Sequence, residues 1–348
     1  MPELDQPVEP IRPIPKGYRD LLVEFHNKNT PERLPKGELL SFNLGEHTIH
    51  LTAYNPAPIV IDGQLHMWAR VEERADEKNS AVILFKQGED GTWTPVEGAP
   101  VFKGLQDPFY CGRIDGDHVF GGVQIYEVAG SSYLGYRTVF YRYKNSYTEL
   151  IDPHGDTVAP FAIGPEKMKD IRLIQLEPGR IGVFTRPQGP GSQFGGRGQI
   201  GYVEIASLGE LQSALTRFDQ QKDPRTLIRG LFVDSASGEE EWGGANQLCL
   251  LPDGKIGVLG HIAGFNGDGK KDYYPITFIF DPKDKSVSHV KIIATAAQFP
   301  AVEAKKGDLG SILFSGGLVR SDEGYSWLYV GIGDSKGGRI RIQDPFVE

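Results

Sequence analysis

Five hairpin patterns recur along this chain of 348 residues, and they restrict the fold more than any other feature. In each pattern an apolar strand runs into a turn glycine, and a second apolar strand follows, as is typical of a β-hairpin. The turn glycines are 53, 63, 75 and 70 residues apart: Gly63, Gly116, Gly179, Gly254 and Gly324. Further strand patterns follow within the units, as at 81–86, 136–143, 198–205 and 274–281. Five repeats of a four-stranded unit predict an all-β fold, a five-bladed β-propeller.

The rest of the sequence agrees with one domain of many short strands and turns. Glycine occurs 44 times and proline 24 times, which suits turns better than long helices. A β-sandwich with a second domain would not explain the even repetition. We expect residues 1–38 to form an arm on the body and residues 39–348 to form the propeller. Two short helices are predicted, Tyr18–Phe25 and Ser207–Leu215, the second with a Ser207–Glu210 capping box.

Polar residues recur at corresponding places in the hairpins. In a hairpin, the start of the first strand and the end of the second lie together, opposite the turn. Five such ends stacked around one axis would form a polar funnel. The first strands contribute Asn55, Asp107, Lys169, Asp170 and Asn246, and the second strands contribute Arg70, Gln124, Arg186, His261 and Asp334.

This ring offers few acids and several cations. Hydrolysis of a glycosidic bond ordinarily takes two carboxylates, whereas a phosphorylase needs one acid and a cationic clamp for the phosphate nucleophile. Asp107, followed by Pro108, is the predicted catalytic acid. The predicted phosphate-binding residues are Lys169, Arg172, Arg186 and His261, with Tyr274 as a cap. The predicted sugar-binding residues are Asn55, Arg70, Asp170, Asn246, Gln247 and Asp334, with Trp242 stacking on the sugar.

Several functional classes are disfavoured. A net charge of −9 argues against a nucleic-acid partner. No apolar run approaches the roughly 20 residues of a membrane span, and the N-terminus lacks the apolar region of a signal peptide, so we expect a cytoplasmic protein. No metal or cofactor motif is evident. Cys111 and Cys249 lie in apolar strand patterns and are expected to be small free thiols.

Several of these stretches resemble known mannoside-processing enzymes. The Tyr54-Asn55-Pro56 segment, followed by Arg70-Val-Glu, resembles the first blade of the phosphorylases of glycoside hydrolase family 130. The same family is resembled by the Asp107-Pro108 strand, the Gly-His261 strand end and the Gly-x-Gly-Asp334 segment. A closer similarity is to the β-1,2-mannosyltransferase/phosphorylase group, glycosyltransferase family 108. It covers about residue 40 to the C-terminus and includes 168–172, 181–188, 195–201, 241–247, 257–263, 314–320 and 344–346.

The resemblance implies a five-bladed propeller that transfers mannose, with inversion, between β-1,2-manno-oligosaccharides and inorganic phosphate. The products would be mannose 1-phosphate and a shortened chain or mannose. It implies that Asp107 is the general acid/base, acting directly or through a sugar hydroxyl. Asn55, Arg70 and Asp334 would bind sugar, and Arg186 and His261 would bind phosphate. One departure is that Arg137 and Arg142 alternate with aromatic residues where family 130 has a basic pair, so their roles, like that of Arg113, stay open.

Two alternatives remain from the sequence. Some members of the group use GDP-mannose as the donor, although no guanine-specific motif is visible here. The second alternative is a propeller that binds carbohydrate without catalysis.

Overall fold

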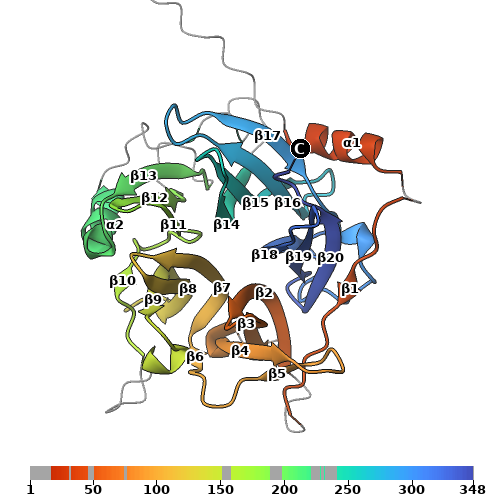
Figure 1. The fold of residues 1–348 in the computed structure, drawn as a ribbon. Helices are drawn as coiled ribbons and strands as arrows, with labels where there is room; N and C mark the ends of the chain where they lie inside the picture. Colours follow the sequence, from red (N-terminus) through yellow and green to blue (C-terminus); the bar gives the residue numbers. More distant parts are fainter. Residues whose placement is uncertain are drawn as a thin grey trace, which may run out of the picture.

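Five small antiparallel sheets stand around one axis in the computed structural model (Figure 1). The structure describes residues 17–30, 33–45, 51–73, 77–150, 158–188, 198–220, 228, 231 and 241–347. The first strand of each hairpin lies innermost, and these inner strands contact one another around the ring in the order β2, β7, β11, β14, β18 and back to β2. The predicted five-bladed β-propeller is therefore confirmed.

The strands of each blade follow one another outward from the axis. Blade 1 contains β2 (Leu51–Ile61), β3 (Gln64–Glu73), β4 (Ala81–Gln87), β5 (Trp93–Pro95) and β6 (Phe102–Lys103). Blade 2 contains β7 (Leu105–Ile114), β8 (Asp117–Glu127), β9 (Leu134–Tyr143) and β10 (Ala162–Ile163). Blade 3 contains, among the described residues, β11 (Arg172–Glu177), β12 (Arg180–Thr185) and β13 (Gly201–Ile205). Blade 4 contains β14 (Trp242–Leu250), β15 (Ile256–Phe265), β16 (Lys271–Phe280) and β17 (Val287–Ile292).

Blade 5 closes the ring with strands from both ends of the chain. It contains β18 (Leu313–Arg320), β19 (Tyr325–Ile332), β20 (Lys336–Gln343) and, at its outer edge, β1 (Glu38–Leu39). Glu38 pairs with Arg339 in the β1–β20 register, and their side chains form an ion pair of 2.5 Å. The boundary expected at 38/39 therefore falls inside β1. Residues 1–16 of the expected arm lie outside the described residues.

Large apolar side chains fill the spaces between neighbouring blades. Trp68 of blade 1 stacks on Phe120 of blade 2 at 5.1 Å, and Phe184 of blade 3 meets Phe280 of blade 4 edge-on at 5.4 Å. All four are fully buried or nearly so. Such pairs add about 0.5–1.5 kcal/mol each beyond their buried area. The blades are therefore held as one rigid frame for the residues at the axis.

Helix α1 (Tyr18–Lys28) covers the predicted 18–25 segment and packs on the outside of blade 4 (Figure 1). Its buried residues Tyr18, Leu21 and Phe25 repeat every three or four positions, as one helix face requires. The Tyr18 ring stacks on Tyr274 at 6.0 Å. This contact places Tyr274 in an apolar cluster rather than at the axis.

The second predicted helix is correct in place but not in its cap. A 3₁₀ turn η3 (Leu208–Glu210) precedes α2 (Leu211–Gln220), so Glu210 does not occupy the third position of an α-helix. The Ser207 side chain makes no capping hydrogen bond, and Glu210 accepts the Ala206 N–H at 3.2 Å. The capping-box prediction is therefore wrong. The other 3₁₀ turns are η1 (Glu77–Asn79), η2 (Tyr147–Leu150) and η6 (Ala296–Gln298).

Candidate active site

Four inner strands, β2, β7, β14 and β18, are interrupted by a shift in register with the next strand of their blade. The β2–β3 register shifts between Tyr54 and Ala57, and the β7–β8 register shifts between Gln106 and Phe109. The residues inside these bulges, Asn55 and Asp107, have left-handed backbones with φ of 49° and 45°. A bulge leaves a residue unpaired and re-aims its side chain. Similar shifts follow Ala245 in β14 and Ser315 in β18.

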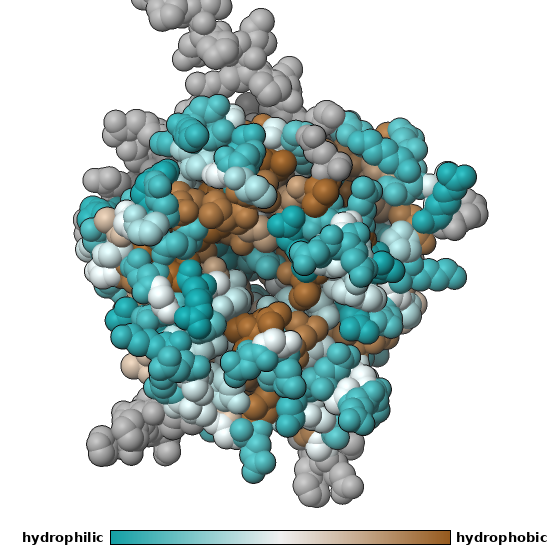
Figure 2. Space-filling view, viewed as in Figure 1, coloured by the Kyte–Doolittle hydropathy of each residue, from teal (hydrophilic) through white to brown (hydrophobic). Residues whose placement is uncertain are grey.

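Asp107 is held by groups from blade 1. Asn55 Nδ2 donates to Asp107 Oδ1 at 2.7 Å, and Arg70 Nη1 lies 3.4 Å from the same oxygen. The Asp107 side chain is 13% exposed, so it stays reachable while its surroundings are largely desolvated. The view along the axis shows a hollow at the centre of the ring (Figure 2). The predicted neighbourhood of Asp107, Asn55 and Arg70 is thus brought together.

A buried carboxylate, Glu72, fixes Arg70. Glu72 accepts hydrogen bonds from Arg70 Nε at 2.8 Å, Tyr54 Oη at 2.6 Å and Ser80 Oγ at 2.7 Å. The Lys305 ammonium forms a further ion pair with it. Burial raises the pKa of Glu72, but Arg70 and the hydrogen bonds outweigh burial and lower it. A buried carboxylate with so many donors stays ionised and sets the orientation of the guanidinium.

Asp334 supplies a second carboxyl group near Asp107. It follows β19, has a left-handed backbone with φ of 51°, and is half-buried. Burial raises the pKa of Asp334, and the charge of Asp107 raises it further, against Arg70, Lys169 and Lys305. The two carboxyl groups therefore repel when both are ionised. Asp334 therefore lies within electrostatic reach of Asp107 and Arg70, and its role in sugar binding stays a prediction.

A basic cluster surrounds Asp170. Asp170 Oδ2 lies 3.3 Å from Arg186 Nη1 and 3.9 Å from His261 Nε2, and Oδ1 lies 3.9 Å from Arg172 Nη2. Burial raises the pKa of Asp170, but Arg186 and the neighbouring cations outweigh it and hold the pKa at about 2. Burial lowers the pKa of His261 to about 3; the Asp170 charge opposes this shift, and the neighbouring cations add to it. His261 is therefore neutral at pH 7.

Lys169 completes this cluster and is only half-buried. Burial lowers its pKa, but Asp170 outweighs burial and the pKa is raised. With His261 neutral, Lys169, Arg172, Arg186 and Asp170 together carry three positive charges and one negative. This is an excess of two positive charges within the cluster, and Asp107 adds a negative charge nearby. A phosphate dianion would neutralise that excess.

Arg172 and Arg186 also form hydrogen bonds that hold neighbouring parts of the fold together. Arg172 donates through Nε to the Asn246 carbonyl at 2.7 Å and lies over the Phe109 ring at 3.7 Å. Arg186 donates through Nε to the Gly243 carbonyl at 2.6 Å and through Nη1 to Gln188 at 2.6 Å. Each is 3% exposed. Both lie beside Asp170, and both are more deeply buried than Lys169.

The structure separates two adjacent tyrosines. Tyr273 stacks on His261 at 5.7 Å, and its hydroxyl oxygen accepts the Trp242 Nε1–H at 2.9 Å. Tyr274 lies on the opposite face of β16, against Tyr18. Trp242 is thus brought next to the basic cluster, whereas Tyr274 is not. Tyr273 occupies the place that we predicted for Tyr274.

Asn246 and Gln247 also have different surroundings. Asn246 Oδ1 lies 2.8 Å from His261 Nδ1, within the cluster. Gln247 reaches blade 5, where its amide accepts the Leu318 N–H and donates to the Leu318 carbonyl. The predicted sugar-binding Gln247 therefore has its amide occupied by the main chain of a neighbouring blade.

Three buried polar atoms at the axis have no hydrogen-bond partner within the described part of the chain: Asn55 Oδ1, Asp170 Oδ2 and Asn246 Nδ2. Buried polar groups are normally paired, and exceptions mark strained or functional places. All three belong to residues predicted from the sequence to form the site.

The family model described as "Protein of unknown function (DUF1861)" matches residues 27–348. The chain belongs to the DUF1861 family.

Solved structures resemble this DUF1861 protein over nearly its whole length. MPT-4, a mannose phosphorylase from Leishmania mexicana solved with a phosphate ion, is 30% identical, with a TM-score of 0.76 and coverage of 94% of this chain and 93% of that one. MPT-1, a GDP-Man-dependent mannosyltransferase from the same organism, is 30% identical, with a TM-score of 0.74 and coverage of 95% and 96%. No curated protein sequence gives a significant match.

A more distant structure shares the fold. The β-1,2-mannobiose phosphorylase from Listeria innocua is 12% identical, with a TM-score of 0.50 and coverage of 86% and 93%. The similarity to MPT-4 and MPT-1 confirms the resemblance to mannosyltransferases and mannose phosphorylases that the motifs suggested.

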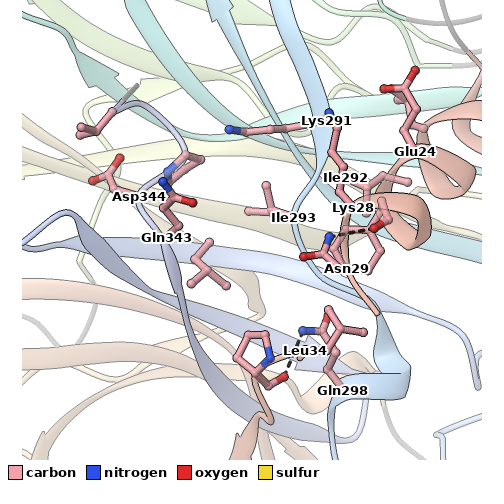
Figure 3. A pocket seen from close by; sticks show the side chains of 16 residues that line it. Glu24, Lys28, Asn29, Leu34, Lys291, Ile292, Ile293, Gln298, Gln343 and Asp344 are labelled. Atoms are coloured by element: carbon pink, nitrogen blue, oxygen red, sulfur yellow. Dashed lines mark hydrogen bonds between the residues drawn. The ribbon is translucent and has the colours of Figure 1, made fainter. Parts of the chain in front are cut away.

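Other features of the DUF1861 protein lie outside the ring of polar residues. A cavity of about 480 Å³ lies between α1, β17 and the end of β20, and its polar lining includes Lys28, Lys291, Gln298 and Asp344 (Figure 3). It contains none of the candidate site residues. Within the described ranges, no cluster of His, Cys, Asp and Glu could hold a metal ion, and no helix is long and apolar enough to cross a membrane. Cys111 and Cys249 are free and half-buried.

Three residues of the DUF1861 site were missed by sequence reasoning: Glu72, Lys305 and Tyr273. Glu72 lies two positions after Arg70 on the same face of β3, a spacing that could have indicated it. We predicted Tyr274 in place of Tyr273, because adjacent residues of a strand face opposite sides and the sequence alone did not show which tyrosine faces the site. Lys305 lies in a connection without strand periodicity, and no local signal marks it.

Proposed function

We propose that this protein is a glycosyltransferase-type enzyme, an inverting β-1,2-mannoside phosphorylase. It would transfer mannose reversibly between β-1,2-linked manno-oligosaccharides and inorganic phosphate, with mannose 1-phosphate as the product. The observation that carries the proposal is the reachable carboxyl of Asp107, which Asn55 and Arg70 hold at the axis. The nearby cluster with two excess positive charges suits a phosphate dianion. The 30% identity to MPT-4 supports the same reaction class.

In the proposed reaction, Asp107 donates its proton to the glycosidic oxygen as the bond to the anomeric carbon breaks. A phosphate oxygen attacks that carbon from the opposite face, which inverts the configuration and gives α-mannose 1-phosphate. In the reverse direction, the Asp107 carboxylate takes the proton of the acceptor hydroxyl as the phosphate leaves. Asn55, Arg70 and Asp334 would hold sugar hydroxyls during both directions.

The phosphate would be held beside Lys169, the most exposed cation of the basic cluster. Arg186 and Arg172 would add charge from behind, and the Tyr273 hydroxyl would donate a hydrogen bond. His261 would contribute no charge, because its pKa is about 3. Such a preorganised clamp stabilises the charge shared by phosphate and sugar in the transition state.

A second candidate is a mannosyltransferase that uses GDP-mannose. Its support is the similarity to MPT-1, which matches that to MPT-4 in identity and coverage. Both reactions would use the same acid and the same sugar-binding residues. They differ in the leaving group, which is phosphate in one and GDP in the other.

The donors can be compared in one experiment. The protein is incubated with mannose and either mannose 1-phosphate or GDP-mannose, and released phosphate or GDP is measured with the oligosaccharides formed. Phosphate release with growth of a β-1,2-linked chain supports the phosphorylase. Release of GDP alone would favour the transferase. No turnover of either donor by folded protein would contradict both and leave a non-catalytic carbohydrate-binding propeller.

A further inference from the structure

Lys305 comes to the site from a distant part of the chain. It lies in the connection between η6 of blade 4 and β18 of blade 5, yet its ammonium contacts Glu72 in blade 1. The Lys305 side chain is 5% exposed and the Glu72 side chain is 0% exposed. Long charged side chains are seldom buried unless they are paired. This buried pair therefore joins the connection to the first blade beside the axis.

Glu72 passes this constraint on to Arg70. Its Oε2 lies 2.6 Å from Arg70 Nη2 and 2.8 Å from Nε, so the guanidinium plane is fixed by a two-point contact. The remaining Arg70 Nη1 is the nitrogen that lies 3.4 Å from Asp107. Only Glu72 and Arg70 separate Lys305 from the proposed catalytic carboxyl.

The same connection braces the turn that carries Asp334. The Lys305 N–H donates to the Gly333 carbonyl at 2.8 Å, and Ser335 Oγ donates to the Glu303 carbonyl at 2.8 Å. Gly333 has a φ of 57°, and a Cβ on it would lie 3.0 Å from Ala304 Cβ. The connection thus packs directly against both sides of Asp334.

We propose that Lys305 is a positioning residue for the mannosyl-binding half of the site. Through Glu72 it holds Arg70 against Asp107, and through its own backbone it holds the Asp334 turn. It acts on sugar-binding groups of blades 1 and 5 together, whereas the proposed phosphate cluster belongs to blades 3 and 4. This inference rests on the proposed mannosyl transfer.

The location predicts which kinetic constants depend on Lys305. Loss of its ammonium frees Glu72 and Arg70 to shift, and displacement of catalytic groups by about 1 Å can reduce turnover by about 100-fold. The cluster around Asp170 is built from residues of blades 3 and 4, whereas Lys305 pairs with Glu72 in blade 1. Turnover and mannoside binding should therefore change, while phosphate binding should not.

The test uses three variants of the full chain. Lys305→Met removes the charge and keeps an apolar stem, and Lys305→Arg keeps the charge. Lys271→Met is the matched control, because Lys271 pairs with Asp308 on the surface with its side chain 42% exposed. For each variant, kcat and the KM values for a β-1,2-mannoside and for inorganic phosphate are measured in the direction of phosphorolysis, with a mannoside that the wild-type protein cleaves. Circular dichroism and thermal unfolding report the folded fraction.

We expect Lys305→Met to lower kcat at least tenfold per folded molecule, with less than a twofold change in the KM for phosphate. Lys305→Arg should regain at least a third of wild-type kcat, and Lys271→Met should match the wild type. A purely structural residue would lower the unfolding temperature and leave kcat per folded molecule unchanged. If Lys305→Met does not fold, Lys305→Gln, which can still donate to Glu72, replaces it with the same criteria.

The possible failures differ. An active wild-type protein in which Lys305→Met stays within twofold of wild-type kcat, or in which Lys305→Arg is no better than Lys305→Met, overturns this inference alone. A wild-type protein that turns over neither mannose 1-phosphate nor GDP-mannose overturns the proposed function, and the inference with it.

Discussion

Adding one methyl group at Gly331 of β19 should displace Asn55 and reduce the activity of the candidate site. A Cβ on Gly331 would lie 1.8 Å from Asn55 Oδ1 and 2.9 Å from Asn55 Cγ. Contacts of a Cβ below 3.0 Å are essentially never found, so the Asn55 amide would have to retreat by about 1.2 Å. That retreat would break or lengthen its 2.7 Å hydrogen bond to Asp107. Gly331→Ala therefore perturbs the acid without touching it.

The expected cost follows from two effects. Overpacking a filled interior costs about 1–3 kcal/mol. Loss of a hydrogen bond to a charged acceptor costs about 1.5–3 kcal/mol. We therefore expect Gly331→Ala to lower the free energy of unfolding by about 2.5–6 kcal/mol. Turnover should fall about 100-fold, because the displaced groups are those that hold the reacting carboxyl.

Urea unfolding and initial rates of phosphate release measure the two effects. Gly267→Ala is the control, because a Cβ there meets no atom within 4 Å. The double variant Asn55→Gly with Gly331→Ala should recover most of the stability, since Asn55 has a φ of 49° that glycine adopts readily. It should not recover activity, because the amide is gone. Wild-type stability and turnover in Gly331→Ala would refute this account of Asn55.

Three further outcomes are expected. Burial lowers the pKa of His261 to about 3 from its ordinary value of 6.5. Between pH 6.5 and pH 3 the unfolded chain therefore binds a proton at His261 that the native protein does not bind. The free energy of unfolding falls as the pH falls through this range. In urea titrations at pH 7 to 4, His261→Gln should remove about 1.4 kcal/mol per pH unit from this slope, and an unchanged slope would contradict a buried neutral His261. Gln247→Ala should cost about 1–3 kcal/mol of stability through lost bonds to Leu318 and leave the KM for mannosides unchanged; a raised KM in rate measurements would instead support sugar binding. Tyr273→Phe should raise the KM for phosphate several-fold in steady-state assays, whereas Tyr274→Phe should leave it unchanged, and the reverse result would restore Tyr274 to the site.

Much of the fold was predictable because it depends on local chemistry. The turn glycines have positive φ at all five hairpins, with Gly63 at 75° and Gly116 at 85°. Alternating apolar strands around such turns have few other solutions, and their repetition indicated the ring. The same repetition placed Asn55 and Asp107 at one level, which the structure bears out by their hydrogen bond.

The remainder depends on tertiary contacts that no local pattern carries. Lys305 reaches Glu72 across 233 positions of sequence. Tyr273 and Tyr274 can be told apart only from the pairing of β16 with β15, where Tyr273 opposes Ala263 and Tyr274 opposes Ile262. The position of Arg172 in the hairpin pattern also did not show that its guanidinium donates hydrogen bonds to main-chain carbonyl groups.

The most direct measurement of the central claim is phosphate release from mannose 1-phosphate and mannose by the wild-type protein and by Asp107→Asn. Asparagine keeps the shape of the side chain and removes the proton-transferring oxygen. We predict phosphate release and β-1,2-linked products with the wild type, and at least a 1000-fold loss with Asp107→Asn, which corresponds to about 4 kcal/mol of transition-state stabilisation. Asp107→Asn protein that folds normally and retains wild-type turnover would contradict the assignment of Asp107 as the single catalytic acid.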